Sequence, residues 1–81
     1  MATKTRTSFE SLKKGMTARV SSITGNSSET VRLQEMGLTE GTVFRVVKVA
    51  PFGDPIEIEL RGYRLCLRKR ETSNFEVEIL D

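Results

Sequence analysis

Hydrophobic and polar residues alternate along much of this chain, in the pattern that predicts short β-strands with one buried face. The clearest example lies after residue 55, where Ile56, Ile58 and Leu60 are each followed by a charged residue. A change of apolar parity near Ser22 predicts a bulge in an earlier strand. Segments with strand-like patterns are found at residues 16–23, 42–49, 56–61, 64–68 and 75–79.

The strand at residues 42–49 is rich in β-branched residues and apolar on both faces, so we expect it to be the central and most buried strand. Residues 56–61 and 64–68 form a hairpin around Gly62 in which their apolar residues share one face. Depending on the loop, either Glu59 lies opposite Arg64 or Glu57 lies opposite Arg68.

A short helix is predicted between the first two strands. Asn26, with a glutamate three positions later, is typical of an N-cap, and the helix should end at Gly37. If Gly37 adopts the left-handed conformation, Leu33 and Leu38 meet in a Schellman motif and Met36 faces the core. Single helical turns are expected at residues 9–12 and 69–73.

Five short antiparallel strands, with turns about every 8 to 12 residues, predict a mainly β fold. An SH3-like barrel with an inserted short helix fits best, because closure is the simplest way for so short a chain to remove exposed sheet edges. Residues 1–7 are polar and show no pattern, so we expect a disordered tail followed by one domain at residues 8–81.

The composition argues against an enzyme. The 81 residues include no histidine, which removes the commonest general base and metal ligand. The single cysteine, Cys66, cannot form an internal disulfide; without a histidine or a second cysteine beside it, we interpret it as structural. The apolar runs are far shorter than the roughly 18 residues of a membrane span, so we expect a cytoplasmic protein.

Four glutamates on the predicted strands, Glu57, Glu59, Glu76 and Glu78, could in principle hold a divalent cation through their oxygens. A transition-metal site normally includes imidazole as well, and alternating glutamates on a strand usually form a solvated face. We therefore expect no metal or cofactor site.

A basic run at residues 68–70, with Arg61, Arg64 and Tyr63 nearby, could bind nucleic acid by phosphate contacts and stacking. The formal net charge is only +2, so we expect no nucleic-acid partner and keep a nucleic-acid-binding barrel as an alternative. A second alternative is a self-assembling scaffold, in which an edge strand at residues 75–80 pairs between subunits.

The segment 50–55 has the prolines and glycine of a loop and carries an aromatic residue, Phe52. Because aromatic residues mostly bury, we expect Phe52 to fold back as a lid on the barrel. If it is exposed instead, it is a natural anchor for a partner, with Pro51 and Pro55 holding the loop in shape.

Three segments resemble the FeoA family: LQEMGLTEG at residues 33–41, APFGDPI at 50–56 and LCLRK at 65–69. The similarity runs from about Gly15 to about Val77 and departs from the family near the ends. It implies a cytoplasmic, non-enzymatic accessory protein that regulates ferrous iron uptake by contacting FeoB, a membrane permease with a GTPase domain. Membrane association is expected only through that partner. The candidate partner-binding residues are Pro51, Phe52, Asp54, Tyr63, Arg64 and Arg68.

Overall fold

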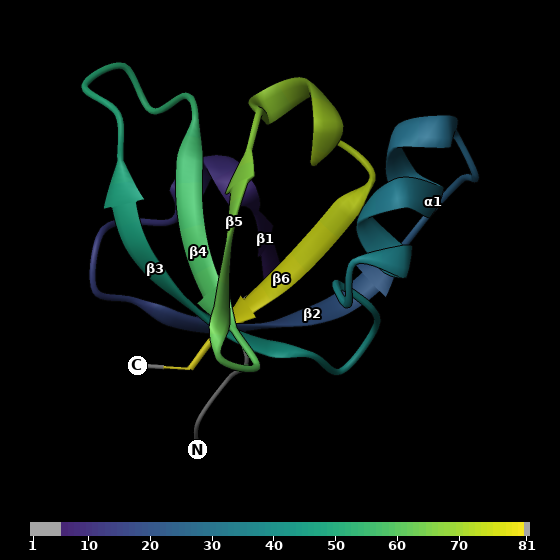
Figure 1. Ribbon diagram of the computed structural model, residues 1–81, viewed down its shortest axis with the longest axis horizontal. Coiled ribbons are helices and arrows are strands. Elements are labelled where there is room, and N and C mark those ends of the chain that lie inside the picture. Colours follow the sequence, from purple (N-terminus) through teal and green to yellow (C-terminus); the bar gives the residue numbers. More distant parts are fainter. Residues whose placement is uncertain (1–5, 81) are drawn as a thin grey trace.

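A computed structural model describes residues 6–80, which form one strongly curved antiparallel sheet with a helix beside it (Figure 1). The sheet order is β1-β6-β2-β3-β4-β5. The strands are β1 (Arg6–Ser8), β2 (Thr17–Ile23), β3 (Val43–Val49), β4 (Ile56–Leu60), β5 (Tyr63–Leu67) and β6 (Phe75–Ile79). The helices are α1 (Ser28–Glu35) and two 3-10 turns, η1 (Phe9–Ser11) and η2 (Lys69–Glu71).

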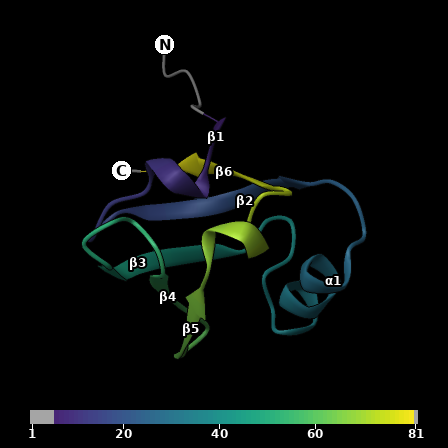
Figure 2. The same cartoon turned by 90° about the horizontal axis from the view of Figure 1, so that it is seen from above.

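The predicted strands, the inserted helix and both helical turns are therefore confirmed. In the view from above, the sheet curls around its interior, with α1 outside at one side (Figure 2). Within the described residues the sheet does not close, because β1 and β5 each pair with one neighbour only. The architecture is a partly open barrel, which fits the SH3-like prediction but leaves β5 as an edge.

Strand β1 was not predicted from the sequence, and it includes two residues of the tail that was expected to be disordered. Arg6 and Thr7 pair with Glu78 and Val77 of β6, while residues 1–5 of that expected tail lie outside the described residues. A strand of three polar residues shows no alternation of apolar and polar positions. Its pairing partners are about seventy positions away in the chain, so no local pattern indicates the pairing either. Since β1 and β2 flank β6 on both sides, the edge strand expected at residues 75–80 is wrong.

Glu78 was expected on a solvated face, but the same strand arrangement buries it. Its strand lies between β1 and β2, where Glu78 is flanked by Arg6 and Arg19, and the residue is only 6% exposed. Arg19 donates to Glu78 Oε1 from Nε at 3.1 Å and from Nη2 at 2.7 Å. The buried carboxylate is thereby compensated by a charged partner.

Helix α1 ends as the sequence predicts but begins one residue later than expected. Ser27, not Asn26, is the N-cap: its Oγ accepts from the Thr30 backbone N–H at 3.2 Å. At the other end, Gly37 has φ +107° and the Leu38 N–H donates to the Leu33 carbonyl at 3.0 Å. This bond and the one from Gly37 N–H to the Gln34 carbonyl define the Schellman motif.

The core fills the curl of the sheet. The Phe9 ring of η1 stacks on Phe44 at 5.3 Å between centroids and meets Phe75 edge-on at 6.2 Å. Strand β3 buries Phe44 and Val46 but exposes Val43, so the expectation that both of its faces are buried is wrong. The other buried hydrophobic residues are Leu12, Ala18, Val20, Leu33, Leu38, Ile56, Ile58, Leu60, Leu65, Leu67 and Val77.

The β4–β5 hairpin adopts one of the two expected registers. Glu59 lies opposite Arg64, and Arg61 and Gly62 form the two-residue loop with φ +51° and +87°. Both central residues have positive φ, as in a type I′ turn, whose backbone twist matches that of the two flanking strands. The predicted bulge in β2 is also confirmed, because the pairing with β6 shifts between Val20 and Ser22.

Candidate interaction surfaces

The loop at residues 50–55 projects from one end of the barrel, between β3 and β4 (Figure 1). It is closed by backbone hydrogen bonds from Ala50 N–H to the Pro55 carbonyl at 3.1 Å and from Gly53 N–H to the Ala50 carbonyl at 2.7 Å. Phe52 at its tip is 92% exposed. The lid expected from the sequence is wrong, because the rings of η1, β3 and β6 already fill the interior and the loop points away from it.

Helical turn η2 lies at the same end of the barrel and is tied to this loop (Figure 1). Asp54 Oδ1 accepts from the Lys69 backbone N–H at 2.8 Å. Arg68, Lys69 and Arg70 are all exposed. We call this region the loop-end surface; it comprises Pro51, Phe52, Asp54, Arg68, Lys69 and Arg70.

Tyr63 and Arg64 lie at the opposite end of the hairpin. The Tyr63 hydroxyl donates to the Met36 carbonyl at the end of α1, and Tyr63 and Met36 are 42% and 38% exposed. Arg64 points to the other face of β5 and pairs with Glu57, with Nη1 and Oε2 3.4 Å apart. We call Met36, Tyr63 and Arg64 the β5-edge surface.

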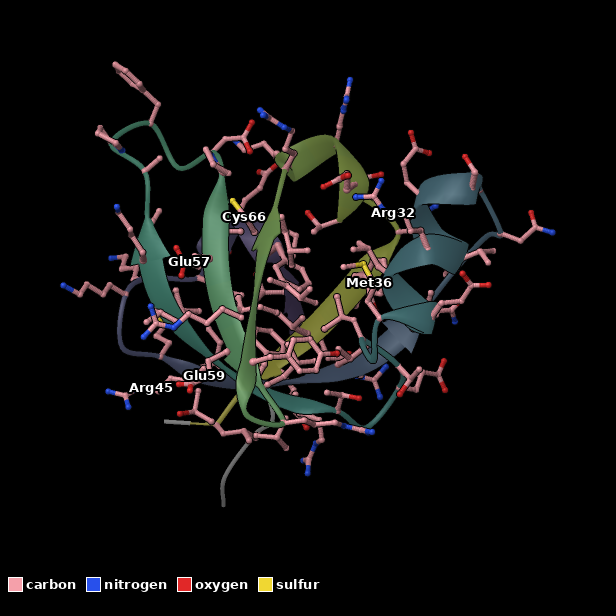
Figure 3. All side chains as sticks on the ribbon, in the orientation of Figure 1. Arg32, Met36, Arg45, Glu57, Glu59 and Cys66 are labelled. Carbon is pink, nitrogen blue, oxygen red and sulfur yellow. The ribbon has the colours of Figure 1, made fainter. Side chains whose placement is uncertain are left out.

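Met36 was expected to face the core. That expectation is wrong, because the residue is 38% exposed and does not belong to the core cluster. Figure 3 shows its side chain on the side of α1 that faces the barrel, close to Arg32. It lies outside the cluster of buried residues because Leu33 and Leu38 already occupy the inner positions of the Schellman motif. Its position beside Tyr63 was not predicted from the sequence, since no local pattern relates α1 to the hairpin.

The six candidate partner-binding residues thus divide between two surfaces. The cross-strand pairs Ile56–Leu67 and Leu60–Tyr63 mark the two ends of the hairpin. Four residue steps along a strand separate these ends by about 13 Å. The basic residues expected to form one nucleic-acid patch are divided in the same way, with Arg61 at the hairpin turn and residues 68–70 at η2.

Cys66 is exposed, as predicted, and lies near the end of β5 that is close to the loop (Figure 3). It contributes to a shallow hollow of about 330 Å³ on the outer face of the sheet. The hollow is lined by Lys48, Val49, Ala50, Pro51, Pro55, Glu57 and Cys66. Its walls include neither a histidine nor a second cysteine beside the thiol, and the structural interpretation of Cys66 stays a prediction.

Among residues 6–80, no three histidine, cysteine, aspartate or glutamate side chains gather in a way that could hold a metal ion. Of the four strand glutamates, Glu57 pairs with Arg64 and Glu78 with Arg19, while Glu76 Oε1 accepts from Ser22 Oγ at 3.0 Å. In the same part of the chain, no helix has the length and apolarity needed to cross a membrane.

A family model and a relative identify the same family. The family model described as FeoA domain matches residues 8–79. A relative from Porphyromonas gingivalis, the Fe(2+) transport protein A/Fe(2+) transporter FeoB fusion protein, is 35% identical over 49 residues. These residues are 60% of this chain but 6% of the relative, so the chain spans a small part of that protein.

Solved structures show the same fold over nearly the whole chain. An FeoA-like protein from Clostridium acetobutylicum is 34% identical with a TM-score of 0.84, and the match covers 99% of this chain and 92% of that one. FeoA of Stenotrophomonas maltophilia, solved with zinc and described as a prokaryotic SH3 domain protein, is 27% identical with a TM-score of 0.74 over 88% of each chain. This chain therefore belongs to the FeoA family, which is linked to ferrous iron transport, and it has the family's SH3-like fold.

Proposed function

We propose that this protein is a non-enzymatic accessory protein of ferrous iron uptake that acts by contacting a FeoB-type permease. The observation that carries the proposal is the fusion relative, in which a segment similar to this chain and a FeoB transporter belong to one protein. A covalent link holds two modules at a high effective concentration, which is useful where they must bind each other. FeoA is a family of transport accessory proteins, which agrees with a role in regulation and not in catalysis.

The β5-edge surface is the part of the molecule that best suits this protein contact. Tyrosine, methionine and arginine are the residue types enriched in protein interfaces, and this surface contains one of each. Tyr63 is held by its hydrogen bond to the Met36 carbonyl, so its ring loses little freedom when a partner binds. Strand β5 is also an edge, so a partner can approach its backbone as well as its side chains.

An amide NMR titration of the labelled protein with the soluble cytoplasmic GTPase region of the permease from the same cell tests this proposal. Saturable shifts should centre on Met36 and Tyr63 and persist at higher salt, because apolar contacts are not screened. Absence of shifts at saturating concentrations would reject contact with that region.

Substitutions at the two ends of the barrel sharpen the test. Tyr63→Ala should weaken binding about tenfold, the effect of losing an interface anchor. Arg64→Glu should also weaken binding and keeps the Tyr63 hydrogen bond, so its effect cannot come from a loosened helix end. Phe52→Ala, an aromatic truncation at the opposite end, should change Kd by less than about twofold; a larger loss for Phe52→Ala than for Tyr63→Ala would contradict the assignment.

A further inference from the structure

We propose that the loop-end surface docks the protein on an anionic lipid membrane. In this arrangement Phe52 enters the interfacial region of the bilayer, and Arg68, Lys69 and Arg70 contact the phosphate groups of the lipid heads. The protein would lie on the membrane surface and not cross it. This docking does not rest on the proposed contact with the permease.

The presentation of Phe52 is the first observation. It is by far the most exposed large hydrophobic side chain among the described residues, at 92%. The loop that carries it is closed by the two backbone hydrogen bonds from Ala50 and Gly53 and fastened to η2 through Asp54. A closed loop of this kind fixes the backbone that carries the ring, so little backbone entropy is lost when the ring is inserted.

The charge around Phe52 is the second observation. The exposed cations Arg68, Lys69 and Arg70 share a shallow depression with Asp54 and Glu10. A fourth exposed cation, Lys48, lines the neighbouring hollow together with Pro51 and the half-buried Glu57. The Asp54 carboxylate already accepts from the Lys69 backbone. Glu57 and Glu71, the other carboxylates of this region, are paired with Arg64 and Arg32. The four exposed cations therefore outnumber the remaining carboxylates, Asp54 and Glu10, as recognition of an anionic lipid surface requires.

The distance of Phe52 from the other exposed large hydrophobic side chains favours lipid over a protein as the occupant. A protein hot spot needs neighbouring apolar contacts that exclude water around the anchor. The other exposed large hydrophobic residues lie elsewhere, on α1, at the start of β3, at the hairpin turn and after β6. A bilayer interface can close around a single aromatic side chain, and its headgroups can adapt to long, mobile cationic side chains.

The two surfaces are compatible on one molecule. The loop-end surface and the hairpin turn are at opposite ends of β4 and β5, as Figure 1 shows. A protein that rests on the membrane through Phe52 therefore keeps Tyr63 free. Loss of one contact should leave the other intact, so the two proposals can fail separately.

Binding to vesicles tests the docking proposal. The full chain is mixed with vesicles of phosphatidylglycerol and phosphatidylcholine at three to seven, or with phosphatidylcholine alone, and binding is measured by flotation at low and high salt. We expect binding to the anionic vesicles, and little binding to the neutral ones or at high salt. Phe52→Trp adds a fluorescent reporter to a chain without tryptophan, and its emission should shift to shorter wavelength on anionic vesicles.

Two variants and one matched control identify the surface. Phe52→Ala should weaken partitioning about tenfold, from the lost burial of one aromatic side chain. Replacing Arg68, Lys69 and Arg70 by Gln should weaken it on the order of a hundredfold, at about fivefold per charge. The control replaces Arg45, Arg61 and Arg64 by Gln, which removes the same net charge away from the loop, and it should lose less than about tenfold.

Three results would overturn the proposal. One is no binding to anionic vesicles by a protein whose NMR spectrum shows that it is folded. Another is equal loss in the loop-end and control triple variants, which would mean general charge attraction. The third is unchanged partitioning of Phe52→Ala while the same variant loses binding to the soluble permease region, which would make the loop a protein contact.

Discussion

Gly37 lies in a crowded turn, whereas several other turn glycines have open space around them. Replacing Gly37 by alanine should therefore destabilise the protein more than replacing one of those glycines. Gly37 has φ +107°, a conformation that residues with a Cβ atom rarely adopt. A Cβ atom built there would also lie 2.7 Å from the Tyr63 hydroxyl oxygen, closer than real Cβ contacts come. Alanine therefore has to displace the hydroxyl that donates to the Met36 carbonyl.

The size of the effect follows from these two terms. A non-glycine residue in the left-handed region costs about 1–2 kcal/mol. Losing the hydrogen bond from Tyr63 adds about 0.5–1.5 kcal/mol. We expect Gly37→Ala to lower the free energy of unfolding by about 2–3 kcal/mol, which for a domain of this size lowers Tm by on the order of 10–20 °C.

Gly62→Ala is the matched control, because Gly62 has φ +87° but no atom within 4 Å of the place where a Cβ would lie. It should lose only the backbone term, about 1–2 kcal/mol. Both variants are compared by urea unfolding, followed by circular dichroism and by the fluorescence of the single tyrosine.

A double variant isolates the contact itself. In the Tyr63→Phe background the oxygen nearest the new methyl group is gone, so Gly37→Ala should cost close to what Gly62→Ala costs. Equal losses for Gly37→Ala and Gly62→Ala in the natural background would refute the steric argument. So would a Gly37→Ala penalty that is the same with tyrosine and with phenylalanine at position 63.

Three further predictions concern the core, the buried ion pair and the thiol. Phe9→Leu should lower the free energy of unfolding by about 1–2 kcal/mol, because it removes the ring stacked on Phe44; calorimetry should show one cooperative transition at a lower Tm. Glu78→Gln should cost about 1–3 kcal/mol in urea unfolding, since it leaves Arg19 without its charged acceptor, and no loss would contradict the role of the pair. Cys66→Ser should change stability by less than about 0.5 kcal/mol, and the thiol should react with a disulfide reagent without unfolding, because the side chain is exposed.

Local patterns predicted most of the fold. The alternation of apolar residues located the strands from β2 to β6, and the leucines around Gly37 predicted the Schellman motif, because both depend on neighbours a few residues apart. Strand β1 and the burial of Glu78 depend on pairing between the two ends of the chain, for which a single sequence carries no local signal. For the hairpin, the sequence left two registers open, and the structure has the one in which Glu59 lies opposite Arg64.

The candidate site was predicted less well, because it depends on where the elements end in space. The residue types were informative: an aromatic loop tip, a tyrosine and arginines that a core does not need. The sequence did not show which of these residues lie together. Tyr63 and Arg68 are five positions apart in the sequence but lie at opposite ends of β5. Phe52 was expected to bury, and the sequence could not show that Phe9 would take the interior position instead.

Because the two surfaces lie at opposite ends of the barrel, one can attach to the membrane while the other contacts a partner. An accessory protein that must find a permease gains if it is held at the membrane, because a search restricted to a surface raises the effective concentration of the partner. In the two proposals above, the loop-end surface supplies weak, charge-dependent attachment to lipid, and the β5-edge surface supplies the apolar anchor and the hydrogen-bonded tyrosine for the permease. Weak attachment at one end and specific contact at the other predict that salt should reduce membrane binding steeply while leaving the permease contact nearly unchanged.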